Sequence, residues 1–449
     1  MPNPPAQNKE TPIVIAERAV DDSTAQRPTF AESLIFWFKL GWISFGGPAG
    51  QIAIMHSELV DRRRWVNENQ FLHALNYCML LPGPEAQQLA TYLGWHLHGT
   101  RGAIAAGSLF VLPSVAILWL LSYLYCTIGQ VAWIAALFAG LKPAVAAIIA
   151  AAVLRIGSRV LKNPVMWVVA ATAFTLIFFG GLPFPILIAL AGLAGLLGSY
   201  FAPVHFQTIR LKPTESAQES FDPRKSKPAH LGRAAKILAI FALLWWTPVA
   251  ALTWWLGPQH AVIHESLFFS KAALVTFGGA YAVLPYVAQQ AVERFNWLSA
   301  PQMLDGLGLA ETTPGPLIMV VQFVGFLGGW NHPGPLSPIV AATLGAMIST
   351  WVTFVPCFLW IFLGAPYVEQ MRTSSKLTAA LSAITAAVVG VVLNLAVWFA
   401  LHVFVVDSRP QWADIGIAIA AFCALAGLKL NMLAVIAAAA LVGLARDLI

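Results

Sequence analysis

One pattern of interruptions occurs twice in this chain, and the second copy follows the first by 232 residues. The interruptions are Phe45-Gly46-Gly47 and Pro82-Gly83-Pro84 in the first copy, and Phe277-Gly278-Gly279 and Pro314-Gly315-Pro316 in the second. The copies align without a gap, and 14 of the 49 positions from Phe36 to Pro84 are identical in the second copy. Because paired glycines and prolines break regular helices, the sequence predicts a duplicated architecture with breaks at matching places.

The sequence around these interruptions is apolar enough to lie in a membrane. Of the 449 residues, 58% are hydrophobic and only 10% are charged, whereas about 25% of the residues in a soluble domain are charged. Apolar runs of about 20 residues recur, and that length crosses about 30 Å of hydrocarbon. Runs such as 146–153 lack the alternation of β-barrel strands. We therefore expect an all-α polytopic membrane protein.

About thirteen apolar membrane segments are expected, in two halves joined by a polar linker. They lie near 30–54, 70–97, 102–126, 131–154, 164–181, 184–202, 234–257, 262–288, 301–330, 338–363, 378–406, 412–428 and 430–446. The expected organisation is a tail at 1–29, a first membrane repeat at 30–206, a basic linker at 207–233, an extra transmembrane helix at 234–261 and a second membrane repeat at 262–449. The two copies begin an odd number of segments apart, which predicts two inverted repeats about an axis in the membrane plane.

Basic residues indicate which loops face the cytoplasm. The linker is rich in Lys and Arg, so it is expected inside, and the amino terminus and the loop at Arg101 follow on the same side. Two complete crossings before Arg101 would put Arg62-Arg63-Arg64 outside, whereas re-entrant or broken helices keep them inside. Such loops also account for the net charge of +6, so no nucleic-acid partner is expected.

The breaks themselves are candidate anion sites. A helix that restarts after a break exposes amide groups without partners, and these carry a positive partial charge. Ser44 and Thr276 occupy equivalent places just before the glycines and add candidate hydroxyl donors. The alternative is that the breaks are packing kinks, which is less compatible with four breaks arranged as a repeat.

Lys39 and Lys271 are a duplicated pair of cations, each six residues before a Phe-Gly-Gly sequence. A lysine near the bilayer centre costs about 2.5–3.5 kcal/mol on insertion scales, so a repeated one suggests a task in substrate binding. The alternative is that each side chain extends to the membrane interface. Arg62 and Arg294 are also equivalent, and they either guard a pathway entrance or orient the loop.

Several titratable residues lie in apolar sequence and are candidates for proton coupling. Glu85 follows the first Pro-Gly-Pro, Glu311 precedes the second, and His73 aligns with Asp305. Helix capping is the alternative for each. Lys142 is a further candidate in a separate apolar segment.

Signs of enzyme activity are sparse. His56 and Asp61 match a spacing seen in some membrane acyltransferases, but position 288, equivalent to His56, is alanine. The sequence has no glycine-rich loop for ATP and no histidine or cysteine spacing typical of metal sites, so no cofactor is expected. The four cysteines, Cys78, Cys126, Cys357 and Cys423, are interpreted as packing residues.

Three runs together resemble the chromate ion transporter family, in its long two-domain form. They are Phe45 to Ala53, Arg62 to Trp65 and Leu80 to Ala90, and the second copy is similar to the carboxy-terminal pattern of that family. The resemblance implies about thirteen spans with antiparallel halves. It also implies chromate export from the bacterial cytoplasm across the inner membrane, driven by the membrane potential or a proton gradient.

Chromate is therefore the expected substrate, and the only other expected partners are membrane lipid and a second copy of the chain in a homodimer. Sulfate or another tetrahedral oxyanion is the nearest alternative, because its shape is similar. A channel and an acyltransferase that uses His56 and Asp61 are more distant alternatives.

Overall fold

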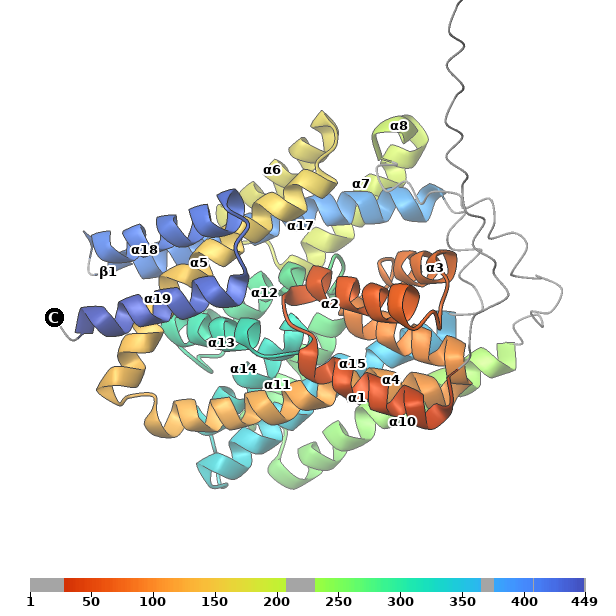
Figure 1. Cartoon of the computed structure of the whole chain (residues 1–449), viewed down its shortest axis with the longest axis horizontal. Helices are drawn as coiled ribbons and strands as arrows, with labels where there is room; N and C mark the ends of the chain where they lie inside the picture. Colours follow the sequence, from red (N-terminus) through yellow and green to blue (C-terminus); the bar gives the residue numbers. More distant parts are fainter. Residues whose placement is uncertain (1–27, 207–230, 365–374, 407, 448–449) are drawn as a thin grey trace, which may run out of the picture.

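The computed structural model describes residues 28–206, 231–364, 375–406 and 408–447, and these are almost entirely helical (Figure 1). Most of the expected tail at 1–29 and of the expected linker at 207–233 lies outside the described residues. The fold class expected from composition, an all-α protein with several apolar helices, is confirmed. The described strands are β1 (Val405–Val406) and β2 (Arg409–Pro410), which form one short antiparallel ladder.

The first half of the chain forms a series of helices that begins with short ones and continues with long ones. They are α1 (Phe30–Ile43), α2 (Gly47–His56), the π-helical turn η2 (Ser57–Arg62), α3 (Glu68–Cys78), α4 (Glu85–Ile128), α5 (Ala132–Val160), α6 (Pro164–Phe178), α7 (Phe184–Phe201) and α8 (Pro203–Phe206). Helix α10 (Leu231–Leu256) stands between the halves. It corresponds to the expected extra helix.

The second half repeats this order. It contains α11 (Ala261–Val275), α12 (Ala280–Gln289), the π-helical turn η3 (Gln290–Arg294), α13 (Ala300–Thr312), the 3-10 turn η4 (Leu317–Met319), α14 (Val320–Asn331), α15 (Pro338–Gly364), α17 (Ser375–Phe404), α18 (Trp412–Phe422), the π-helical turn η6 (Cys423–Gly427) and α19 (Met432–Asp447). Helix α4 corresponds to α14 and α15 together. Its kink at His98 and Gly99 lies where the second copy has the connection between α14 and α15.

Six helices of the described chain are long and apolar enough to cross a membrane. They are Glu85–Ile128, Ala132–Val160, Phe184–Phe201, Gly232–Leu256, Pro338–Gly364 and Ser375–Phe404. Four shorter apolar helices add Pro164–Phe178, Leu317–Asn331, Trp412–Gly427 and Met432–Arg446. The expected count of about thirteen membrane segments is therefore not confirmed by helix length.

The helices next to the breaks are too short to cross alone. Helices α2 and α12 have 10 residues each, α3 has 11 and α13 has 13. At a rise of 1.5 Å per residue, a helix of this length covers about 15–20 Å, roughly half of the hydrocarbon layer. The re-entrant or broken form of these segments, each entering and leaving on one side, stays a prediction.

The two copies share details of local structure beyond their helix boundaries. Arg64 and its equivalent Asn296 both have positive φ, 52° and 50°. The next helix begins in both copies with a capping box, Asn67 with Gln70 and Ser299 with Gln302. A capping box satisfies otherwise free amides at a helix start. The duplication therefore extends to how the chain turns between the two motif helices.

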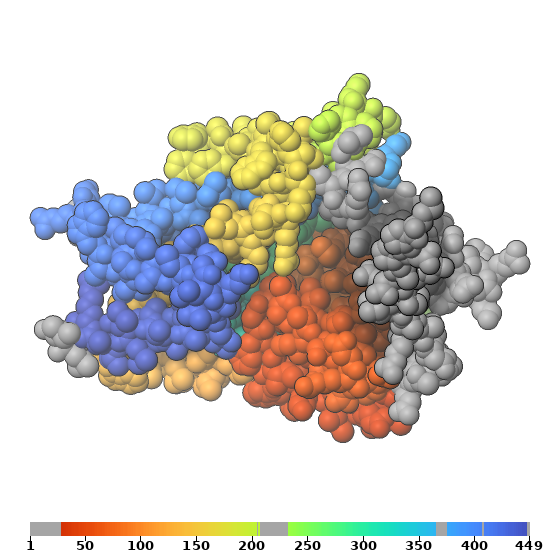
Figure 2. Space-filling model, turned by 45° about the horizontal axis from the view of Figure 1, so that its top comes forward, coloured from red at the N-terminus to blue at the C-terminus, as the bar shows by residue number. Residues whose placement is uncertain are grey.

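Long helices of both halves enclose the short ones. Helix α17 packs against α5, α6 and α7, α15 packs against α11, α14 and α4, and α19 packs against α5. Figure 2 shows the N-terminal helices and the C-terminal helices as adjacent blocks of one face. The two Pro-Gly-Pro breaks are buried in this assembly, where the two halves meet.

Candidate anion site at the crossed helix breaks

The breaks of the two copies are hydrogen-bonded to each other. The amide of Gly83 donates to the carbonyl of Thr276 at 2.7 Å, and the amide of Gly315 donates to the carbonyl of Ser44 at 2.7 Å. Gly83 and Gly315 are equivalent positions, and so are Ser44 and Thr276. Such a reciprocal exchange is what a two-fold relation between two units produces. Each Pro-Gly-Pro break therefore lies against the Phe-Gly-Gly break of the other copy.

Glycine is required at the centre of each Pro-Gly-Pro sequence. Gly83 has φ of 129° and Gly315 has φ of 106°, a region that other residues rarely adopt. A Cβ on Gly83 would stand 2.8 Å from Nε2 of Gln88 and 2.9 Å from Sγ of Cys357, and one on Gly315 would overlap Oγ of Ser114. Both positions are closed to any side chain.

The helices that restart at the breaks have no side-chain caps, within the part of the chain that the structure describes. This holds for α2 after Gly46, α4 after Pro84, α12 after Gly279 and η4 after Pro316. The helices that precede the breaks, α1, α3, α11 and α13, are all capped by a side chain. Free amides at a helix start carry a positive partial charge and attract anions. The motifs thus bring four uncapped helix starts into one region.

The two kinds of break differ in exposure. Pro82, Gly83 and Pro84 are buried, as are Pro314 to Pro316. In the Phe-Gly-Gly sequences, Gly46 is exposed, Gly47 and Gly278 are half-buried, and Gly279 is buried. A ligand would therefore meet the Phe-Gly-Gly breaks first, with the Pro-Gly-Pro breaks behind them.

Side-chain donors hold the carbonyl groups of the breaks. Gln51 donates from Nε2 to the carbonyl of Gly315 at 2.5 Å and to that of Ser44 at 3.3 Å. Gln88 donates to the carbonyl of Pro82 at 2.8 Å, and Ser114 donates to that of Pro314. The carbonyls that would repel an anion are thus turned toward protein donors. Gln51 and Ser114 were missed by sequence reasoning, although polar residues in apolar helices were a usable signal.

The hydroxyls of Ser44 and Thr276, expected as donors at the breaks, donate within their own helices. Ser44 Oγ donates to the carbonyl of Leu40 at 2.6 Å, and Thr276 Oγ1 donates to that of Ala272 at 2.6 Å. Both side chains are buried at the carboxyl ends of α1 and α11. Their hydroxyl protons are therefore engaged in ending the helices before the breaks.

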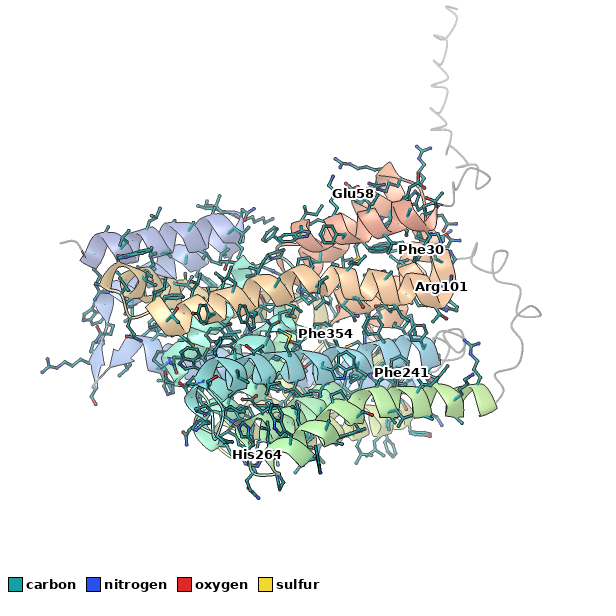
Figure 3. The ribbon with its side chains drawn as sticks, turned by 90° about the horizontal axis from the view of Figure 1, so that it is seen from below. Phe30, Glu58, Arg101, Phe241, His264 and Phe354 are labelled. Atoms are coloured by element: carbon teal, nitrogen blue, oxygen red, sulfur yellow. The ribbon has the colours of Figure 1, made fainter. Side chains whose placement is uncertain are left out.

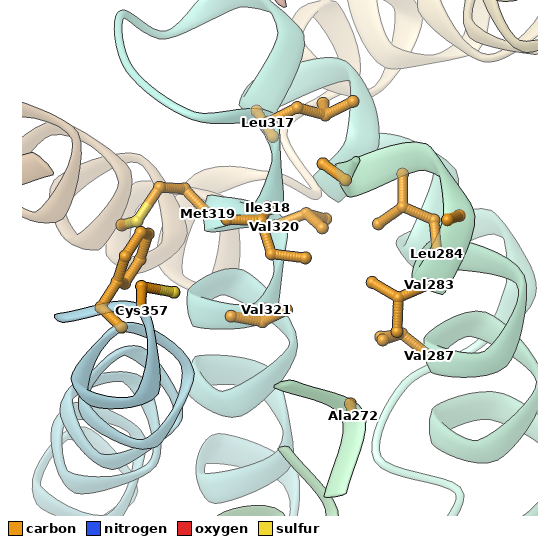
Figure 4. Close-up of a cluster of buried hydrophobic side chains, with 14 of the residues drawn as sticks. Ala272, Val283, Leu284, Val287, Leu317, Ile318, Met319, Val320, Val321 and Cys357 are labelled. Atoms are coloured by element: carbon orange, nitrogen blue, oxygen red, sulfur yellow. The ribbon is translucent and has the colours of Figure 1, made fainter. Parts of the chain in front are cut away.

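The residues that follow the two Pro-Gly-Pro breaks differ in polarity. After the first break come Glu85, Gln87, Gln88 and Thr91, and the equivalent positions after the second break are Leu317, Met319, Val320 and Phe323. Figure 4 shows Leu317 to Val321 among the apolar side chains of α12 and Cys357 of α15. The backbone of the site is duplicated, whereas its polar lining comes mainly from the start of α4.

Two carboxylates predicted to couple protons lie around the start of α12. Tyr281 donates its hydroxyl to Oε1 of Glu311 at 2.5 Å, and Glu311 is 5% exposed. Glu85 is half-buried, with Oε1 3.6 Å from where a Cβ on Gly279 would stand. Arg155 on α5 interacts electrostatically with Glu311, and Arg159 interacts with Glu85. The structure brings together acidic residues that are 226 positions apart (311 − 85).

Asp305 forms a second buried cluster with Lys142, which the sequence had suggested only as an isolated candidate. Nζ of Lys142 is 3.6 Å from Oδ2 of Asp305, and the hydroxyl of Tyr125 donates to the same oxygen at 2.8 Å. Oδ1 of Asp305 is buried without a partner in the described part of the chain. His73, which aligns with Asp305, is half-buried on α3.

The other predicted charges lie at the surface of the described protein. Lys39 and Lys271 are exposed on α1 and α11, so the structure does not bring them to the buried breaks. Arg62 and Arg294 are exposed and bind the residue four positions earlier, Glu58 at 2.6 Å and Gln290 at 3.3 Å. 

The suggested acyltransferase pair, His56 and Asp61, lies at the end of α2 and in η2, the same turn that contains Arg62. His56 lies 3.5 Å from Asp61 and 2.6 Å from Glu68, and both carboxylates are exposed. The two residues belong to a surface network of ion pairs.

Duplicated broken helices with uncapped starts, enclosed by long apolar helices, define a polytopic membrane protein of the transporter class. The chain belongs to the chromate transporter family, whose model matches residues 31–196 and 264–444. The resemblance seen in the motifs is thereby confirmed.

Relatives of this family cover most of the chain. The chromate transport protein of Pseudomonas aeruginosa is 32% identical over 447 residues, covering 95% of each chain. That of Cupriavidus metallidurans is 28% identical over 428 residues, covering 94% of each, and the probable chromate transport protein of Synechococcus elongatus is 29% identical over 364 residues, covering 81% of this chain and 82% of its own. No solved structure matches this chain.

Proposed function

We propose that this protein is a secondary transporter that exports chromate from the cytoplasm across the bacterial inner membrane. Membership of the chromate transporter family and the names of its relatives support the substrate. The observation that carries the mechanism is the reciprocal contact of the breaks, Gly83 with Thr276 and Gly315 with Ser44. It gathers uncapped helix starts from both copies where the two halves meet.

Chromate is a tetrahedral dianion, and its recognition needs hydrogen-bond donors whose neighbouring carbonyl groups are engaged elsewhere. The amides at the starts of α2, α4 and α12 supply such donors, and the carbonyls beside them are already bound by Gln51, Gln88 and Ser114. Backbone amides at a helix start bind oxyanions without a fixed full charge. Arg155 and Arg159 on α5 add positive charge near the same region and are exposed.

The two break types would play different parts in transport. The half-exposed Phe-Gly-Gly sequences meet the anion, while the buried Pro-Gly-Pro sequences hold the two copies against each other. Each of these contacts joins one copy to the other. A shift of one copy relative to the other therefore changes the positions of the helix starts at both Phe-Gly-Gly breaks. We propose that the copies are inverted repeats and that their relative movement alternates access to the site.

Energy coupling is proposed to involve the carboxylates beside the anion site. Glu311 with Tyr281, and Glu85 close to Gly279, lie where a bound dianion would change the local charge. A proton that binds there from outside after chromate has left, and is released to the cytoplasm before chromate binds again, would link export to the inward proton gradient. The membrane potential also favours export of a dianion, because the cytoplasm is negative.

Chromate uptake into everted membrane vesicles tests this function. Vesicles that contain the protein should accumulate chromate when energised, and vesicles from cells without it should not. Equal uptake in the two preparations would remove the assignment. Sulfate has similar shape and charge, so excess sulfate is included as a competitor, and a protein that accumulates sulfate in preference to chromate would be the alternative oxyanion carrier.

A further inference from the structure

A second buried carboxylate, Glu265, lies on α11 outside the site described above. Its side chain is fully buried, and neither carboxylate oxygen has a hydrogen-bond partner among the described residues. The equivalent position in the first copy is Ser33, so this carboxylate belongs to the second half alone. An intramembrane carboxylate is costly, so one that is kept without a partner points to a task.

The carboxylate of Glu265 sits in a cradle made by glycines. A Cβ on Gly328 of α14 would overlap Oε1 of Glu265, and a Cβ on Gly345 of α15 would stand 2.6 Å from Oε2. Any larger residue at either position would displace the carboxylate. Helices α14 and α15 are therefore shaped around this group.

No charged residue compensates Glu265 in the described chain. Among the helices packed against α11, α14 has no titratable side chain, α15 has Cys357, and α12 has Tyr281 and Tyr286. The cations of these elements are Arg233 and Lys236, both in the first six residues of α10, and Lys271 on α11, and all three are exposed. Glu293 and Arg294 in the neighbouring loop are also exposed. An ionised carboxylate would be uncompensated here, so the group is suited to carrying a proton.

A histidine-lined hollow adjoins this carboxylate. Its volume is about 410 Å³, and its lining includes His260, His264, His332 and Trp297. Trp297 also borders the Glu265 cradle, because a Cβ on Gly328 would lie 3.1 Å from its Cγ. His264 precedes Glu265 in sequence. In Figure 3, His264 lies at the lower left of centre and Arg101 at the right edge, and the proposed topology places Arg101 on the cytoplasmic side.

His260 links this hollow to the start of α11. Its Nδ1 accepts from the amide of Val262 at 3.3 Å, and its Nε2 lies 3.1 Å from the carbonyl of Pro333. These partners require a neutral ring with the proton on Nε2. His260 therefore both lines the hollow and caps the helix that carries Glu265.

We propose that Glu265 is a proton-binding site of the transport cycle and that the histidine-lined hollow connects it to the outer face. The proposal rests on the proposed transport function and adds Glu265 as a further proton-binding group to the carboxylates beside the anion site.

Glu265→Gln tests the proposal, since it preserves the shape of the side chain and removes the exchangeable proton. In proteoliposomes, chromate counterflow without any gradient should persist, whereas acceleration by an imposed pH gradient should fall about tenfold. Glu293→Gln is the matched control, because Glu293 is exposed and should leave both rates unchanged. Retention of the full pH-gradient response by Glu265→Gln would overturn the proposal, and so would a response that follows a sodium gradient instead.

Infrared spectroscopy gives a readout that is independent of transport. The difference spectrum between wild type and Glu265→Gln at neutral pH should contain the C=O band of a protonated carboxylic acid. Carboxylate bands in its place would overturn the proposal. Failure of chromate counterflow in both wild type and variant would contradict the proposed transport function. The infrared measurement would still show whether Glu265 is protonated.

Discussion

The amide of Gly83 donates to the carbonyl of Thr276 at 2.7 Å, and this bond joins residues that are 193 positions apart (276 − 83). Its counterpart, from Gly315 to Ser44, has the same length. The pair interlocks the two copies at the points where their helices are interrupted. We therefore expect a movement at one break to shift the other copy, because a backbone hydrogen bond joins them directly.

Gly83→Ala and Gly315→Ala should each abolish chromate uptake and lower the melting temperature. A left-handed conformation costs a residue with a side chain about 1–2 kcal/mol, and the added Cβ also meets Gln88, Cys357 or Ser114. Uptake in everted vesicles and thermal unfolding in detergent measure the two effects. Gly416→Ala is the control, because nothing lies within 4 Å of that position. Normal uptake by both break variants would show that the crossing is dispensable.

Tyr281→Phe should slow transport about tenfold or more. The change removes the hydroxyl that donates to Glu311, and a hydrogen bond to a charged group contributes about 1.5–3 kcal/mol. Initial rates of energised chromate uptake give the measurement. Tyr200→Phe serves as the control, since Tyr200 is exposed. Equal rates for the two variants would separate Tyr281 from the transport step.

Lys142→Met alone should destabilise the protein by about 3–5 kcal/mol, because Asp305 would remain buried without its cation. The double variant Lys142→Met with Asp305→Asn should recover part of this loss. Thermal unfolding of wild type, both single variants and the double variant forms a double-mutant cycle. Additive effects would mean that the 3.6 Å contact between these side chains contributes no coupling energy.

Lys39→Ala and Lys271→Ala should leave chromate resistance close to the wild-type level. Both side chains are exposed rather than directed to the breaks, and a lysine can reach the membrane interface through its four methylenes. Resistance is scored by growth on chromate, with expression checked by immunoblot. Loss of resistance at normal expression would restore both lysines as candidates for substrate binding.

Arg62→Cys and Arg294→Cys should be labelled from opposite sides of the membrane. These equivalent positions lie at the ends of η2 and η3, and inverted repeats place equivalent loops on opposite faces. An impermeant thiol reagent applied to intact cells and to everted vesicles, in a background without the four native cysteines, makes the measurement. Labelling of both from the same side would contradict the inverted arrangement.

The sequence alone determined those features that depend on local chemistry or on composition. Apolar content indicated a helical membrane protein, and the recurrence of Phe-Gly-Gly and Pro-Gly-Pro at one spacing located the breaks, because proline removes a helical hydrogen bond and glycine permits positive φ. The spacing of 232 residues revealed the duplication, and it extends in the structure to equivalent capping boxes at Asn67 and Ser299. Each of these sequence signals acts on the backbone within a few residues of its own position.

Only the tertiary structure decided which of these residues meet. Nothing in the spacing of Lys142 and Asp305 indicates their contact, and the exposure of Lys39 depends on which face of α1 packs against α4. The crossing of Gly83 with Thr276, and the lack of a partner for Glu265, arise in the same way. Such contacts depend on how helices far apart in sequence pack together, and helix periodicity within one segment carries no information about its distant neighbours.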